Sequence, residues 1–69
     1  MVTKRMLNYI GLFTRDQIKK GLRKWYALDS NILVQLKGCT KSVLILTLIG
    51  TIIDADLDFE QLKTLLKQN

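Results

Sequence analysis

The chain has 69 residues and a net charge of +5, with one cysteine, no histidine and no proline. This composition excludes an internal disulfide, a metal site built from several thiolates or imidazoles, and a catalytic triad that depends on histidine. Hydrophobic residues make up 48% of the chain and charged residues 25%, which is typical of a globular domain. A chain this short buries only about 60% of its unfolded surface, so we expect residues 1–69 to form a single compact helical domain with a small core.

The first predicted helix lies within Lys4–Phe13, where apolar residues recur at helical spacing and Gly11 marks the end. A second helix is expected to begin at Thr14. Its N-terminus carries the capping-box pattern, because Gln17 follows the threonine three residues later. This second helix should run to about Ala27.

The segment from Thr14 to Tyr26 has two chemically different sides when it is wound at 3.6 residues per turn. One side gathers the residues that we expect to be buried, namely Ile18, Leu22, Trp25 and Tyr26. The other side carries five cations that we take as candidate partner-binding residues: Arg15, Lys19, Lys20, Arg23 and Lys24. Such a helix can bury one face and offer the other to an acidic partner.

The segment that follows is open to two interpretations. Asp29 or Ser30 can cap a helix over residues 31–37, but β-branched residues also allow an α+β fold with a hairpin over residues 31–49. As a strand, Val43–Ile53 would be apolar on both faces and would need cover that few other elements can supply. As a helix, the segment aligns one polar stripe of Thr47, Gly50, Thr51 and Asp54. We therefore expect a helix.

The last predicted helix is Phe59–Lys67, with Asp58 as its N-cap. The expected fold is all-α, a small bundle of four to five short helices with Val43–Ile53 as its central apolar helix. The residues expected to pack around this helix are Ile18, Leu22, Trp25, Phe59, Leu62 and Leu66. Val43–Ile53 has eleven residues, far fewer than the roughly 20 of a spanning helix, so we expect no membrane span.

No constellation of residues in the sequence supports catalysis. Asp54, Asp56 and Asp58 alternate as at the start of a calcium loop, but Phe59 takes the place of the glycine that the loop requires. Cys39 has no histidine to activate it, and we interpret it as a half-buried structural thiol. We therefore expect no catalytic residue, no metal and no cofactor, and we expect that the protein is not an enzyme.

Charge is distributed unevenly along the chain. Residues 1–41 carry a net charge of +7 and residues 42–69 a net charge of −2. This asymmetry favours a regulatory binding protein whose basic helix contacts the phosphates of a nucleic acid. The alternative is a protein–protein interaction module (an adaptor, inhibitor or antirepressor of the kind that phages and mobile elements encode) that docks on an acidic protein surface. We further expect a homodimer, because the apolar share is high for so short a chain, and a cytoplasmic location, because disulfides are absent.

Overall fold

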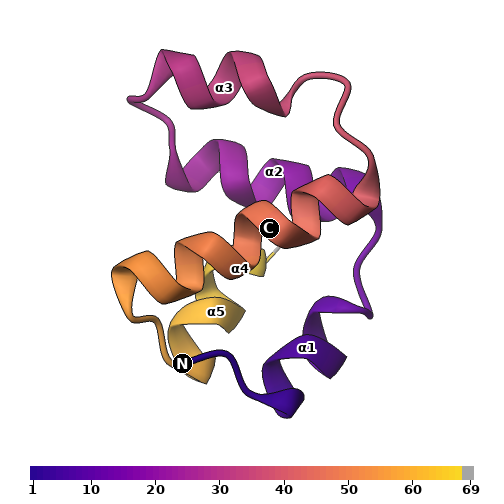
Figure 1. Cartoon of the computed structure of the whole chain (residues 1–69), viewed down its shortest axis with the longest axis vertical. Coiled ribbons are helices and arrows are strands. Elements are labelled where there is room, and N and C mark those ends of the chain that lie inside the picture. The colour runs from indigo at the N-terminus through magenta and orange to yellow at the C-terminus, as the bar shows by residue number, and fades with distance from the viewer. Residues whose placement is uncertain (68–69) are drawn as a thin grey trace.

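The protein is described by a computed structural model that covers residues 1–67, and it is helical with no strand in that range (Figure 1). The helices are α1 (Lys4–Ile10), α2 (Arg15–Trp25), α3 (Ser30–Leu36), α4 (Lys41–Ala55) and α5 (Phe59–Leu66). The predicted all-α bundle is thereby confirmed. The alternative hairpin over residues 31–49 is wrong, because α3 and the first part of α4 occupy that stretch. No helix within the described range has both the length and the apolar character needed to cross a bilayer.

Every helix begins just after a residue whose side-chain oxygen accepts a backbone N–H from the first turn, at 2.8–3.3 Å. These N-caps are Thr3, Thr14, Asp29, Thr40 and Asp58. Two of them form complete capping boxes, Thr14 with Gln17 and Asp58 with Gln61. The caps predicted at Thr14, Asp29 and Asp58 are confirmed, and these N-caps satisfy backbone donors that a helix cannot pair internally.

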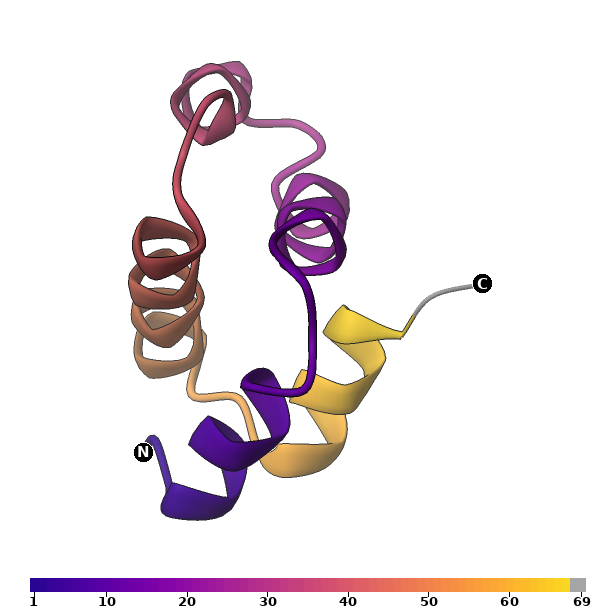
Figure 2. The same cartoon turned by 90° about the vertical axis from the view of Figure 1, so that its right-hand side faces the viewer.

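Helix α2 packs against α3, α4 and α5. Figure 2 shows α4 on one side of the molecule and α2 on the other, with α3 above them and α1 and α5 below. The core between the helices consists of apolar side chains that are at most 5% exposed: Met6, Ile10, Ile18, Leu22, Leu36, Leu44, Leu48, Ile52, Leu57, Leu62, Leu65 and Leu66. The amphipathic side of α2 therefore does hold the core together, through Ile18 and Leu22.

Helix α4 contains the apolar segment predicted over Val43–Ile53, but it is buried along one face only. Thr51, which belongs to the predicted polar stripe, is 2% exposed and faces the core. Its hydroxyl donates to the Thr47 carbonyl oxygen at 2.9 Å, and its oxygen lies 2.6 Å from the Tyr26 hydroxyl. Since the threonine proton is already used, Tyr26 donates to Thr51 and links the end of α2 to α4.

Gly21 allows α2 to approach α5 closely. The glycine is buried, and a Cβ at this position would lie 2.9 Å from the Leu65 carbonyl oxygen and 3.1 Å from a methyl carbon of the same residue. Only a residue without a side chain fits at this distance, because the backbone atom it would meet cannot rotate away. The spacing between α2 and α5 is thus set by one glycine.

We predict that Gly21→Ala destabilises the protein by about 1–3 kcal/mol, because the added methyl forces the two helices apart. Gly11→Ala is the matched control: Gly11 has helical backbone angles, and a Cβ there would meet backbone atoms only at 3.5–3.6 Å. The control should change the free energy of unfolding by less than about 0.5 kcal/mol. Urea denaturation followed by circular dichroism measures both, and equal effects would contradict the close approach.

Candidate binding surface

The structure divides the five candidate cations on α2 into three kinds. Arg15 is half-buried, and its Nε donates to the Cys39 carbonyl oxygen at 2.6 Å while its Nη1 pairs with Asp16 at 3.1 Å. This arginine therefore ties α2 to the loop before α4 and offers little to a partner. Lys19 is half-buried, whereas Lys20, Arg23 and Lys24 are exposed and form no ion pair within residues 1–67.

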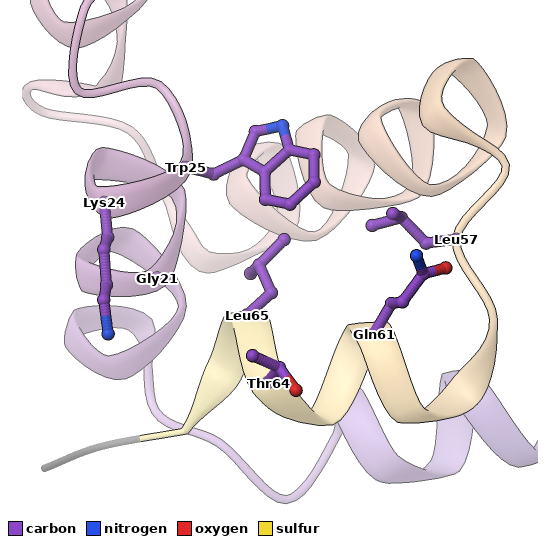
Figure 3. A pocket seen from close by; sticks show the side chains of 7 residues that line it. All are labelled: Gly21, Lys24, Trp25, Leu57, Gln61, Thr64 and Leu65. Carbon is purple, nitrogen blue, oxygen red and sulfur yellow. The ribbon is translucent and has the colours of Figure 1, made fainter.

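For Trp25 the sequence-based prediction of burial is wrong. It was expected in the core, but it is 45% exposed. Trp25 is the last residue of α2, and its indole lies over Leu65 of α5 (Figure 3). Tyr26, the other aromatic residue expected on the buried side, is half-buried through its contact with Thr51 of α4.

A groove lies between α2 and α5 below the indole. It encloses about 280 Å³, and its walls come from both helices and from the turn before α5. The lining residues are Gly21, Lys24, Trp25, Leu57, Gln61, Thr64 and Leu65, and we call this site the Trp25 groove. Figure 3 shows apolar Leu57 and Leu65 facing the indole across the groove, while Lys24 extends along α2 at its border. An apolar hollow is thus bordered by positive charge.

A second hollow, of about 400 Å³, lies between α2 and α3. Three cations line it together, Lys19 and Arg23 from α2 and Lys37 from the end of α3. The sequence reasoning did not find Lys37, because the residue lies outside the basic helix. Positive charge gathered from two helices raises the local potential more than one helix face does alone. We call this site the α2–α3 hollow.

Other chemistry-bearing groups are scattered over the fold. The Cys39 thiol is half-buried and donates to the Gln35 carbonyl oxygen at 2.9 Å, as a structural thiol does. Within residues 1–67, no three side chains of His, Cys, Asp or Glu converge as they would around a metal ion. Comparison with known proteins finds no match to the chain among protein families, curated proteins or solved structures.

The exposure of Trp25 predicts how strongly its removal affects stability. We expect Trp25→Ala to lower the free energy of unfolding by only about 1–2 kcal/mol, because nearly half of the side chain already lies in water. Leu22→Ala, one turn earlier in α2 at a site with no exposed surface, should cost about 2–5 kcal/mol. Urea denaturation measures both variants. A loss at Trp25 as large as the loss at Leu22 would show that the indole belongs to the core.

Proposed function

We propose that the protein is a non-enzymatic regulatory binding protein, and that its Trp25 groove docks an acidic, amphipathic helix of a partner protein. The observation that carries the proposal is the position of a half-exposed tryptophan beside exposed lysines. Trp25 and Leu65 supply apolar surface for an anchoring side chain. Lys24 lines the groove with them, and exposed Lys20 lies one turn earlier on α2. Amphipathic helices bind grooves in this way, with apolar anchors inside and charged residues at the rim.

The size of the groove supports a side chain as its occupant. Pockets for drug-sized ligands enclose about 300–1,000 Å³, and the Trp25 groove lies just below this range at about 280 Å³. One or two apolar side chains of a partner fit such a space. Tryptophan is also the residue type that most often dominates the binding energy at protein interfaces.

The positive charge of α2 favours a partner segment with negative charge. The exposed cations on α2 belong to the half of the chain that carries a net charge of +7, so an acidic segment is attracted before contact is made. The proposal retains the cytoplasmic homodimer that the sequence predicts. Three exposed large apolar residues, Val43, Leu46 and Ile53, lie on α4 and not on the cationic helix.

Nucleic-acid phosphates are a second candidate ligand, which the α2–α3 hollow favours. Lys19, Arg23 and Lys37 border this hollow together, and cations spaced over two helices can contact successive phosphates. The two candidates use different residues, so charge reversals on α2 and α3 can separate them.

The test of docking is a titration with an amphipathic helical peptide that carries leucines on one face and glutamates beside them. Trp25 is the only tryptophan, so its fluorescence reports directly on the groove. We expect a blue shift on binding, because the peptide removes water from the exposed side of the indole. The double variant Lys20→Glu/Lys24→Glu should weaken binding at least about tenfold, a loss of about 1.4 kcal/mol.

The matched control is Lys4→Glu/Lys41→Glu, which changes the net charge equally but lies on α1 and α4. Equal loss of affinity in the control would reduce the interaction to general charge attraction and contradict docking in the groove. The same protein is titrated with duplex DNA at several salt concentrations. DNA binding that falls steeply with salt and is lost in Lys19→Glu/Lys37→Glu, without peptide binding, would establish the second candidate in place of the first.

A further inference from the structure

Helix α4 lies on the opposite side of the molecule from α2 (Figure 2) and carries exposed apolar residues. Val43 is 45% exposed, Leu46 67% and Ile53 59%. Together with Gly50 these residues follow the spacing i, i+3, i+7 and i+10, which aligns them along one face of a helix. The opposite face of α4 holds the buried residues Leu44, Leu48, Thr51 and Ile52. The stripe is therefore apolar surface that the fold itself leaves uncovered.

Within the described residues of a single copy, no neighbouring atom requires a glycine at position 50. It lies inside a 15-residue helix, where glycine costs about 1 kcal/mol relative to alanine. A Cβ at Gly50 would meet nothing within 4 Å, whereas a Cβ at Gly21 would collide with α5. The absence of a side chain at Gly50 therefore leaves a shallow depression in the middle of the exposed stripe.

We propose that this stripe is the contact surface between two copies of the chain, which pair their α4 helices in antiparallel orientation about a two-fold axis. Leu46 of each copy then fills the depression at Gly50 of the other, and Val43 lies at the level of Ile53. The Leu46–Gly50 pair and the Val43–Ile53 pair have the same midpoint along the helix, at the level of Leu48. A single two-fold axis at that level therefore generates both contacts. A two-fold interface requires this kind of self-complementary surface.

The charges at the ends of α4 select the antiparallel orientation. Asp54 lies near the C-terminal end of the helix, and Lys41 lies at its N-terminal end. Antiparallel pairing brings each Asp54 to the N-terminal end of the other α4, where the helix dipole and Lys41 are positive. Parallel pairing would instead bring two Asp54 carboxylates together.

The expected dimer is weak and depends on concentration. A standard interface buries about 800 Å² on each partner, and the whole chain exposes only 4725 Å². A single pair of helices covers less than the standard area, which is typical of transient association. Because the stripe lies on α4, two Trp25 grooves remain free in the pair, and the inference deepens the proposed function by assigning the contact surface of its homodimer.

The test is sedimentation equilibrium of the full chain from about 1 μM to about 1 mM, a range that spans weak association. We expect a monomer–dimer equilibrium. Leu46→Glu should raise the dissociation constant at least about tenfold, since it places two buried charges against apolar surface. Gly50→Gln should do the same by filling the depression, while circular dichroism shows an unchanged or higher helix content. Leu12→Glu makes the same change at a leucine that is 78% exposed between α1 and α2, and it should leave the equilibrium unaltered.

Asp54→Asn tests the orientation, because its effect has opposite signs in the two arrangements. It should weaken an antiparallel dimer and strengthen a parallel one. A wild-type chain that stays monomeric over the whole range, or a dimer that Leu46→Glu and Gly50→Gln leave intact, would overturn the proposal. Peptide binding at Trp25 is measured separately in the micromolar range, so failure of the dimer and failure of the groove are told apart.

Discussion

The close approach of α2 to α5 at Gly21 is the constraint on which the rest of the structure depends. At this point the backbone of α5 occupies the space that a side chain of α2 would need. A Cβ added at Gly21 would lie only 2.9 Å from the Leu65 carbonyl oxygen. The approach buries Leu22 and Leu65 beside the glycine and leaves Trp25, one turn further along α2, at the edge of the contact. The Trp25 groove lies beside this contact, and Gly21 itself is one of its lining residues. The close approach at Gly21 therefore shapes both the packing of the fold and the candidate site.

Local features of this fold could be read from the sequence because they depend on residues a few positions apart. The capping boxes at Thr14 and Asp58 need only the following glutamine, and the cap at Asp29 needs only the next turn. The choice of helix over hairpin for residues 31–49 follows from burial, since a strand there would have required cover on both faces. The caps are confirmed because local geometry decides them, and the helix is confirmed because the apolar pattern of the segment makes a strand costly to bury.

The misplaced residues are those whose surroundings come from distant parts of the chain. A helical wheel places Trp25 on the apolar side of α2, but it cannot show that α5 covers only one side of the indole. Thr51 is assigned to a polar stripe by the same reasoning, yet the hydroxyl of Tyr26, 25 residues away, satisfies it in the core. Arg15 counts as a free cation until the Cys39 carbonyl oxygen, 24 residues away, is brought to it. In each case a long-range partner reverses what the local pattern indicates.

Helices α2 and α4 are covered by their neighbours to different extents, and this difference accounts for the positions of the cationic surface on α2 and the apolar stripe on α4. Helix α2 packs against α3, α4 and α5, so its exposed residues are confined to a strip that includes Lys20, Arg23 and Lys24 beside the half-exposed Trp25. Helix α4 lies at one side of the bundle and is apolar on nearly all sides, and within residues 1–67 its outer residues Val43, Leu46 and Ile53 are left exposed. A second copy that covers α4 leaves both cationic strips facing outward. In the proposed dimer, two Trp25 grooves would bind a partner with repeated acidic segments more tightly than one groove does, because the second contact is made within the same complex. Weak self-association through α4 would then make the response of the groove depend on the concentration of the protein itself.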